Sequence, residues 1–242
     1  MTRSQAKPLF VAEIGMNADG NFDLNYELIR AAKWAGADIA KFQVGWRNGV
    51  DEINHMNAER LQLLKKWCAQ FDIEFMASII TPEAWTLVKA VGMDRYKIAS
   101  RTVGGDPQLC KDILAEGKEV FMSLGMYEGE GFPFEAKNLK YLWCKSKYPC
   151  RYEDLETLPE WFDKFYGYSD HLMGIEGCLL ALSRGANLIE KHFTLNKTSR
   201  VIRDHGLSAT PEEFRQMVTW GRDVWNLTMH LKSKAKTPAG AR

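Results

Sequence analysis

Two histidines each close a short apolar stretch of this sequence. His171 follows the stretch that begins at Trp161, and His192 follows the stretch that begins at Ala186, with a helical segment at residues 174–185 between them. In a parallel barrel the carboxyl ends of neighbouring strands meet at one mouth, so both imidazoles would reach the same cavity. Two imidazoles are half of a common divalent-metal site. The alternative is that one histidine is hydrogen-bonded within the structure and the other lies on the surface.

Lysines and hydroxyl groups occupy similar positions in the other predicted strands. Lys41 and Lys97 lie within apolar stretches, and further polar residues end or follow the strands: Glu13, Gln43, Ser78, Ser100, Ser123, Ser146, Tyr148, Ser169 and Glu190. Ammonium groups together with hydroxyls and backbone N–H groups suit a phosphate or a carboxylate. The alternatives for the lysines are salt bridges to Glu13 or Glu190, or a Schiff base formed by a lysine with a depressed pKa.

Short apolar strands alternate with helices along the chain. The eight predicted strands are Leu9–Gly15, Asp38–Val44, Ile73–Ile80, Arg95–Ser100, Glu119–Leu124, Leu139–Cys144, Tyr166–Ser169 and Ala186–His192. Helices are expected at Leu24–Trp34, Ala58–Phe71, Pro107–Glu116, Leu155–Phe165, residues 174–185 and Pro211–Leu231, and another begins at Pro82. Alternation of this kind gives parallel βαβ units with right-handed crossovers. We therefore predict an α/β fold, a single (β/α)8 TIM barrel over residues 1–232.

Two segments depart from this alternation. Residues 126–138 contain Gly129, Gly131 and Pro133, so the fifth helix is expected to be missing or reduced. The segment 233–242 is rich in Lys, Ala, Gly and Pro and is predicted to be a disordered tail.

Composition excludes several classes of protein. The net charge of +1 gives no global attraction to nucleic acid, and no apolar stretch reaches the length of a membrane helix. The first eight residues lack the apolar core of a secretion signal, so a cytoplasmic location is expected. The five cysteines form no C-x-x-C pair, which favours reduced, packed thiols over a zinc ribbon or a disulfide framework.

Short motifs follow one another in order across residues 9–215. They are residues 12–17 with Gly20, residues 35–38 leading to 41–43, residues 96–100, 123–126, 148–149, 167–171 with 174–176, and 189–194. One example is the run Gly167-Tyr168-Ser169-Asp170-His171. Each motif alone is weak, but the ordered set resembles the catalytic barrel of the N-acetylneuraminate (sialic acid) synthases.

The resemblance implies an enzyme that condenses phosphoenolpyruvate with an aldehyde sugar, giving a nonulosonic acid and phosphate. It implies that His171 and His192 hold a divalent metal, Mn²⁺ before Mg²⁺ or Co²⁺, and that the enzyme could form a homodimer. It assigns catalysis to Glu13, Lys97, Thr102, Tyr148 and Asp204. It assigns substrate binding to Lys41, Gln43, Ser78, Ser100, Arg101, Ser123, Ser146 and Ser169.

The sequence departs from the family pattern at three places. The segment between Lys41 and Ser78 is short, so a loop that covers the substrate is expected to be trimmed. Arg101 and Thr102 follow Ser100, where the family usually has glycine and an acidic residue. A threonine hydroxyl cannot transfer protons at neutral pH as a carboxylate does. The family's small C-terminal antifreeze-like domain, which donates an arginine to the neighbouring subunit's sugar site, has no counterpart in these 242 residues. Three arginines could take the place of that arginine: Arg101, Arg200 and Arg203.

These departures leave two alternatives to the synthase. One is a barrel that still binds phosphoenolpyruvate or a phosphosugar, has lost turnover and serves a regulatory or accessory role. The other is a metal-independent aldolase in which Lys41 or Lys97 forms a Schiff base.

Overall fold

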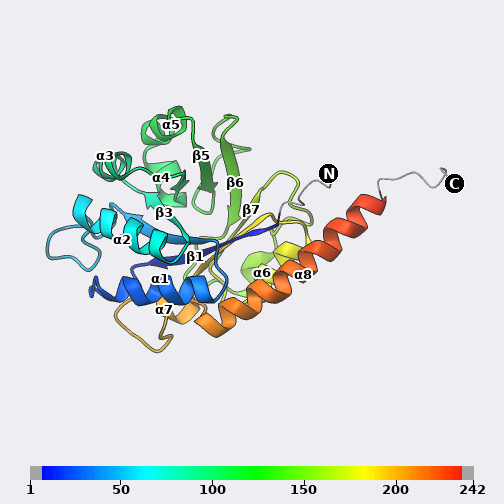
Figure 1. The fold of residues 1–242 in the computed structure, drawn as a ribbon. Coiled ribbons are helices and arrows are strands. Elements are labelled where there is room, and N and C mark those ends of the chain that lie inside the picture. The colour runs from blue at the N-terminus through cyan, green and yellow to red at the C-terminus, as the bar shows by residue number, and fades with distance from the viewer. Residues whose placement is uncertain (1–6, 236–242) are drawn as a thin grey trace, which may run out of the picture.

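Eight parallel strands close into a barrel in which each strand pairs with the next along the chain and β8 pairs with β1 (Figure 1). The computed structural model describes residues 7–235. The strands are β1 (Leu9–Gly15), β2 (Ile39–Val44), β3 (Glu74–Ile79), β4 (Arg95–Ile98), β5 (Glu119–Ser123), β6 (Leu139–Cys144), β7 (Gly167–Asp170) and β8 (Leu188–His192). The predicted TIM barrel is confirmed.

Alternate residues of the strands point into the barrel and build three layers there. The middle layer is apolar: Val11, Ile39, Met76, Phe121, Leu142 and Leu188. Toward the amino ends of the strands, Arg95 pairs with Glu74 at 2.6 Å and with Glu119 at 2.5 Å. Toward the carboxyl ends the inward residues are polar, and β1 places Glu13 beside Lys41 of β2. The apolar layer therefore separates the Arg95 ion pairs at the amino ends of the strands from the polar mouth at their carboxyl ends.

Helices cover the outside of the barrel. They are α1 (Leu24–Trp34), α2 (Ala58–Gln70), α3 (Pro82–Val91), α4 (Ser100–Gly105), α5 (Pro107–Ala115), α6 (Glu176–Ser183), α7 (Asp204–Leu207) and α8 (Pro211–Ala235). Two short helices among them, α4 and α7, contribute residues to the mouth of the barrel. The capping side chains of Asn57, Thr81 and Asp106 fix the starts of α2, α3 and α5. No helix in the described part of the chain combines the length and hydropathy of a membrane span.

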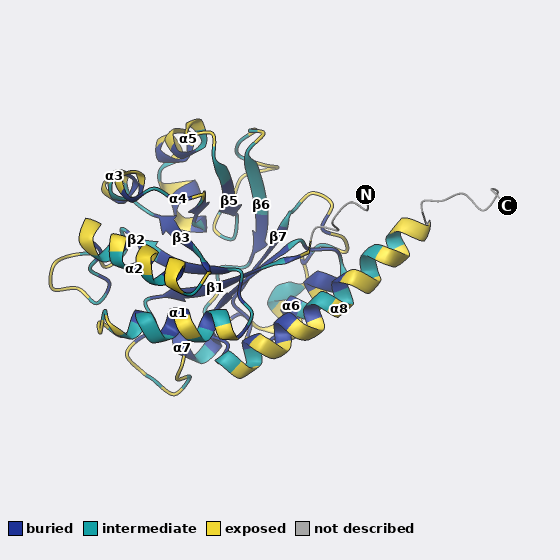
Figure 2. Cartoon of the chain, viewed as in Figure 1, coloured by how far each residue is buried: buried dark blue, intermediate teal, exposed yellow. Residues whose placement is uncertain are grey.

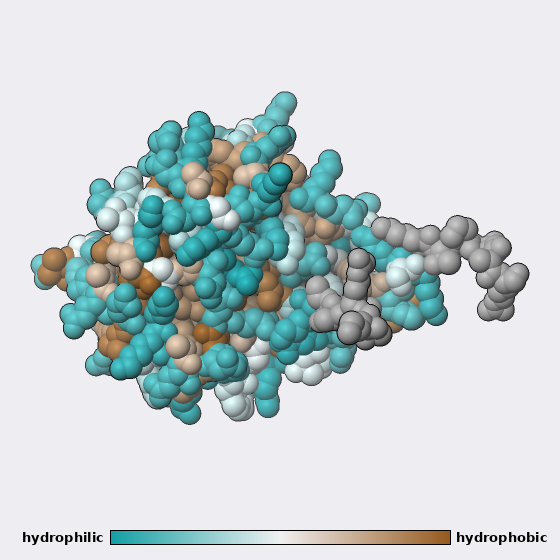
Figure 3. All heavy atoms as spheres, turned by 45° about the horizontal axis from the view of Figure 1, so that its top comes forward, coloured by the Kyte–Doolittle hydropathy of each residue, from teal (hydrophilic) through white to brown (hydrophobic). Residues whose placement is uncertain are grey.

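The surface helices are amphipathic. In Figure 2 the outward sides of α1, α2 and α8 are exposed, whereas the strands behind them are buried. The face in Figure 3 is mainly hydrophilic, with small hydrophobic areas between the polar side chains. These three helices therefore bury their apolar sides against the rest of the molecule, as expected for an α/β fold.

Of two unusual connections, one agrees with the prediction and one differs from it. Between β5 and β6 the chain forms turns without a helix, as predicted. The helix predicted at Leu155–Phe165 is wrong, because only a short 3₁₀ turn, η1 (Tyr152–Leu155), forms there. Pro159 disfavours a continuous helix, and Arg184 donates to the carbonyls of Leu158 at 3.3 Å and Pro159 at 3.1 Å. A contact from α6's end thus satisfies backbone groups that a helix would have paired.

The last helix continues beyond its predicted end. The sequence predicted Pro211–Leu231, and α8 runs to Ala235, so the first residues assigned to the tail are helical. The remaining predicted tail, 236–242, lies outside the described residues.

Candidate active site

The carboxyl ends of all eight strands surround one cavity of about 710 Å³. That volume is typical of sites for small molecules. Every residue that the sequence assigned to the site lines this cavity except Thr102, and of the three arginines offered for the sugar site, Arg200 does not line it. The lining residues among them are Glu13, Lys41, Gln43, Ser78, Lys97, Ser100, Arg101, Ser123, Ser146, Tyr148, Ser169, His171, His192 and Asp204.

Lys41 lies at the centre of a buried set of charges. Its Nζ is 2.7 Å from Glu13 Oε2 and 3.5 Å from Glu190 Oε1, and it donates to Ser78 Oγ at 2.8 Å. Burial alone would lower the pKa of Lys41, but the two carboxylates outweigh burial and raise it. Lys41 is therefore a fixed positive charge at the floor of the cavity.

Lys97 is the less compensated of the two lysines. Its Nζ donates to Ser123 Oγ at 2.8 Å and to the Ile98 carbonyl at 3.1 Å, and it lies 3.9 Å from Glu190 Oε1. Burial lowers the pKa of Lys97, and the positive charge of Lys41 lowers it further. The ammonium of Lys97 is thus poorly compensated by the protein, and an anionic ligand would stabilise it.

The two buried carboxyl groups have pKa values shifted in opposite directions. Burial raises the pKa of Glu13 despite its contact with Lys41. Burial also acts on Glu190, but Lys41, Lys97 and the Ser169 hydroxyl, 2.8 Å away, hold its pKa at about 2. Two carboxyl groups separated in this way suit different tasks: Glu190 stays anionic, and Glu13 can hold a proton.

The two histidines converge on the cavity as predicted. Their ring centroids are 5.4 Å apart. His171 Nδ1 lies 2.9 Å from the Lys145 carbonyl, which leaves its Nε2 for a ligand. His192 Nδ1 is buried and has no hydrogen-bond partner in residues 7–235, and burial lowers the pKa of His192 to about 4. The free Nε2 of His171 and the lowered pKa of His192 suit metal ligation, and the two histidines would supply two of a metal's ligands.

The described residues hold no group of three or more His, Cys, Asp or Glu side chains arranged around a metal position. A metal at the two histidines would therefore take its remaining ligands from substrate or water. The donor set fits a divalent ion and does not select one.

Comparison with known proteins gives the family. Residues 48–233 match the model of the NeuB family. The N,N'-diacetyllegionaminic acid synthase of Legionella pneumophila is 30% identical, over 88% of this chain and 71% of that protein. This chain belongs to the NeuB family. The resemblance to sialic acid synthases inferred from the ordered motifs is confirmed.

Other NeuB-related proteins cover the same barrel. The human N-acetylneuraminate-9-phosphate synthase is 28% identical, over 87% of this chain and 68% of that protein. The crystal structure of N-acetylneuraminic acid synthetase from Leptospira borgpetersenii superposes with a TM-score of 0.81 at 25% identity, covering 98% of this chain and 96% of that chain. The likeness therefore spans both the mouth and the supporting barrel.

The sequence assigned Thr102 to the catalytic residues, and the structure places it outside the cavity. The chain turns into α4 at Ser100, and Thr102 faces back toward β3, where its hydroxyl donates to the Ile79 carbonyl at 3.1 Å. Thr102 is buried, but it does not line the cavity. The preceding Arg101 does line the cavity. The Thr102 hydroxyl is thus used in a hydrogen bond to β3 and does not face the cavity.

Cys144 lines the cavity, but it was not assigned to the site from the sequence. Its thiol lies 3.7 Å from His171 Nδ1 and 3.7 Å from Ser146 Oγ. Burial opposes ionisation of both Cys144 and His171, and their mutual attraction lowers the pKa of Cys144 and raises that of His171. Period-two alternation in β6 could have found it, because Cys144 faces the same way as inward Leu142.

Two further lining residues, Trp46 and Arg47, were also missed. They lie in the loop after β2, outside any strand pattern. Only their position after an inward-facing strand end could have indicated them.

Proposed function

We propose that this chain condenses phosphoenolpyruvate with an aldehyde sugar and releases phosphate. The observation that carries the proposal is the cavity itself. In a NeuB-family barrel, it brings two buried lysines and several serine hydroxyls together with two buried histidines. Phosphoenolpyruvate carries both a phosphate and a carboxylate, which match this set of cationic and hydroxyl donors.

Binding and orientation fall to the strand-end residues. Lys41 and Lys97 neutralise the anionic groups of phosphoenolpyruvate, and the neighbouring hydroxyls donate to the remaining oxygens: Ser78, Ser100, Ser123, Ser146 and Ser169. Both lysines and all of these serines except Ser146 are buried before substrate arrives, so they need little rearrangement to stabilise charge on the departing phosphate.

His171 and His192 would hold a divalent metal, for which we propose Mn²⁺. When bound, such an ion would polarise the aldehyde oxygen of the sugar. The enol carbon of phosphoenolpyruvate forms the new bond to the aldehyde carbon as its carbon–carbon double bond becomes single. Water then adds at the resulting cationic carbon and gives up a proton, and the bond from that carbon to the phosphate oxygen breaks as phosphate leaves. The protein's part is to keep the two substrates in contact.

Glu13 is the candidate for proton transfer. Its raised pKa allows it to hold a proton in the buried mouth, and Gln43 Nε2 donates to its Oε1 at 2.7 Å, which fixes the carboxyl group. Protonated Glu13 can supply the proton that the aldehyde oxygen takes up as the carbon–carbon bond forms. Glu13 would thereby do the work expected of an acidic residue at position 102.

A Schiff-base aldolase is the second candidate, because burial lowers the pKa of Lys97 and makes a neutral amine more accessible. Borohydride reduction in the presence of an aldehyde or ketone substrate distinguishes the two. Covalent labelling at Lys97 supports the aldolase, and its absence together with phosphate release supports the synthase.

The direct test is phosphate release from phosphoenolpyruvate over a panel of aldoses, with and without Mn²⁺. Release that requires both an aldose and metal is expected. Saturable phosphoenolpyruvate binding without release across the panel would instead support a barrel with a regulatory role.

The metal assignment is tested separately. His171→Ala and His192→Ala should each abolish stoichiometric Mn²⁺ binding, measured by electron paramagnetic resonance. Retention of binding in both variants would move the metal elsewhere. The homodimer and the cytoplasmic location stay predictions of the sequence.

A further inference from the structure

Two arginines at the rim of the cavity are each held against an aromatic ring. The guanidinium of Arg101 lies 3.6 Å from the ring centroid of Trp46, and that of Arg203 lies 4.4 Å from the ring centroid of Tyr148. All four side chains line the cavity. Stacking fixes the plane of a guanidinium and leaves its N–H edges free for a ligand.

The two stacks lie on opposite sides of the mouth. Trp46 follows β2 and Arg101 follows β4, whereas Tyr148 follows β6 and Arg203 lies between β8 and α7. In a barrel closed in chain order, strands two to four face strands six to eight. A ligand group above the floor of the cavity therefore has an arginine on either side.

Carboxyl groups lie among the lysines at the floor of the cavity, whereas its rim is rich in arginine. At the floor, Glu13 contacts Lys41, and Glu190 contacts both Lys41 and Lys97. At the rim, three arginines face a single carboxylate: Arg47, Arg101, Arg203 and Asp204.

The pairing at the rim is weak as well as unequal. Asp204 is 3.6 Å from Arg203 Nε, and within residues 7–235 no carboxylate pairs with Arg101. The rim thus carries about two uncompensated positive charges in a chain whose net charge is +1.

We propose that the aldehyde acceptor carries a phosphomonoester, and that Arg101 and Arg203 bind it. This rests on the proposed condensation, in which the floor lysines take the anionic groups of phosphoenolpyruvate. A phosphomonoester near neutral pH is close to a dianion, which matches the rim charge better than a carboxylate does. Arginine also binds phosphate oxygens through two parallel N–H donors. Arg101 is therefore a specificity-determining residue for the acceptor.

The test uses ligands that cannot react. Binding of glucitol 6-phosphate, glucitol and gluconate is measured by calorimetry on the full chain saturated with phosphoenolpyruvate. Glucitol 6-phosphate should bind at least tenfold more tightly than the other two. Arg101→Gln should remove most of that preference while leaving the affinity for phosphoenolpyruvate within about twofold.

The chain offers a matched control. Arg215 stacks on Trp34 at 4.8 Å, between α8 and α1 and away from the cavity. Arg215→Gln removes the same charge and the same kind of stack, and it should leave the preference intact. Trp46→Leu keeps the charge of Arg101 but removes the ring that orients its guanidinium. We expect this variant to lose part of the preference for glucitol 6-phosphate.

The outcomes separate this inference from the proposed function. If phosphoenolpyruvate binds but glucitol 6-phosphate has no advantage, or if Arg101→Gln matches Arg215→Gln, the phosphate site is overturned and the condensation stands. A preference for gluconate would overturn it in favour of a uronic acid. If phosphoenolpyruvate does not bind, the proposed function fails, and glucitol 6-phosphate titrated alone into the same variants still decides whether Arg101 binds phosphate.

Discussion

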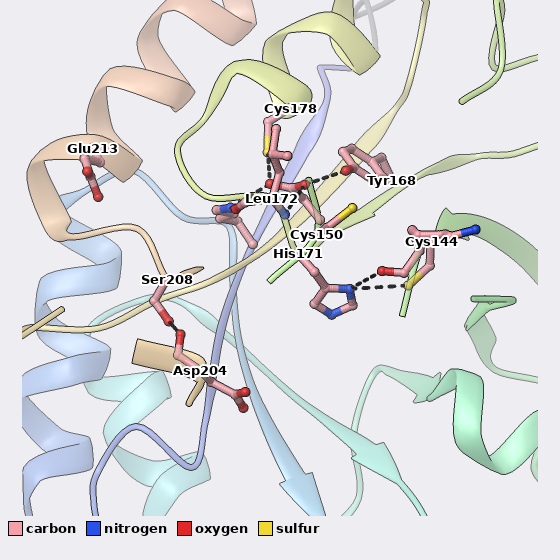
Figure 4. Close-up of polar contacts among 12 residues, drawn as sticks. Cys144, Cys150, Tyr168, His171, Leu172, Cys178, Asp204, Ser208 and Glu213 are labelled. Atoms are coloured by element: carbon pink, nitrogen blue, oxygen red, sulfur yellow. Dashed lines mark hydrogen bonds and ion pairs between the residues drawn. The ribbon is translucent and has the colours of Figure 1, made fainter. Parts of the chain in front are cut away.

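Strands β7 and β8 carry buried charges on both of their faces, and the two faces differ. Inward-facing Ser169, His171, Glu190 and His192 line the cavity. On the opposite face, toward α6, Asp170 pairs with Lys191 at 2.6 Å. Figure 4 shows Tyr168 and Cys178 meeting at this outer cluster, while the ring of His171 lies apart from it beside Cys144.

The outer cluster is complete without a ligand. Asp170 also accepts from Tyr168, from the backbone N–H of Leu172 at 3.0 Å and from Cys178 at 3.3 Å, and Lys191 also donates to the Leu172 carbonyl. Burial opposes both charges, but their attraction lowers the pKa of Asp170 and raises that of Lys191. The charges and hydrogen-bonding groups of Asp170 and Lys191 are thus paired within the protein, so we interpret the cluster as structural.

The inner cluster is incomplete. Within residues 7–235, Glu190 Oε2 and His192 Nδ1 have no hydrogen-bond partner. Burial lowers the pKa of Lys97, so its charge is a net cost to the fold. Buried polar groups left unsatisfied by the protein are those that a ligand can satisfy. The same two strands thus hold one cluster whose polar groups pair with one another and one cluster with polar groups that a ligand could pair with.

The largest effect should come from breaking the outer cluster. Lys191→Met leaves Asp170 buried without a counter-charge, and we expect the free energy of unfolding to fall by about 3–5 kcal/mol. Denaturant unfolding measures it. The double variant Asp170→Asn with Lys191→Met should recover much of the loss. Lys89→Met, which breaks an exposed pair with Glu116, should cost less than about 1 kcal/mol. A similar small loss for Lys191→Met would show that the outer pair is not structural.

The next effect is a pH dependence of stability that comes from His192. Burial lowers its pKa to about 4, whereas the unfolded chain takes up this proton near pH 6.5. The contribution is fully present above pH 6.5 and is lost as the pH falls toward 4, because the unfolded state then binds more protons. Over this window the loss is on the order of 3 kcal/mol.

His192→Gln should remove this part of the pH dependence, measured as the free energy of unfolding at several pH values from 7 to 4. His230→Gln, at an exposed position of α8, is the matched control. Identical pH profiles for His192→Gln and the unmodified chain would mean that folding does not lower the pKa of His192.

Lys97→Met separates binding from stability. The dissociation constant for phosphoenolpyruvate should rise about 100-fold, which corresponds to about 2.7 kcal/mol. The free energy of unfolding should stay the same or increase, since Lys97 is charged at a cost and Glu190 keeps Lys41 as a partner. Calorimetry and denaturant unfolding give the two values. An unchanged dissociation constant would move the anion site, and a large loss of stability would place Lys97 with the structural cluster.

The barrel and most of its mouth could be predicted because period-two alternation is local. Lys41 with Gln43, and Glu190 with His192, share a face in any strand, and the closed barrel then brings them together. What could not be predicted depends on contacts between distant segments. Arg184 donates to the Leu158 carbonyl in a segment where the sequence predicted a helix. The stack of Arg101 on Trp46 joins two segments that share no sequence pattern.

Thr102 also depends on a contact between distant segments, and its substitution gives the smallest predicted change in stability. Motif position placed Thr102 in the site, but the start of α4 at Ser100 turns it toward the Ile79 carbonyl. Thr102→Val keeps the shape and removes that hydrogen bond, which should cost about 1 kcal/mol of unfolding free energy. Turnover should change by less than about twofold, whereas Glu13→Gln should lower kcat at least about 100-fold. Loss of kcat in Thr102→Val comparable to that in Glu13→Gln would return Thr102 to the reacting groups and make the cavity lining a poor guide to function.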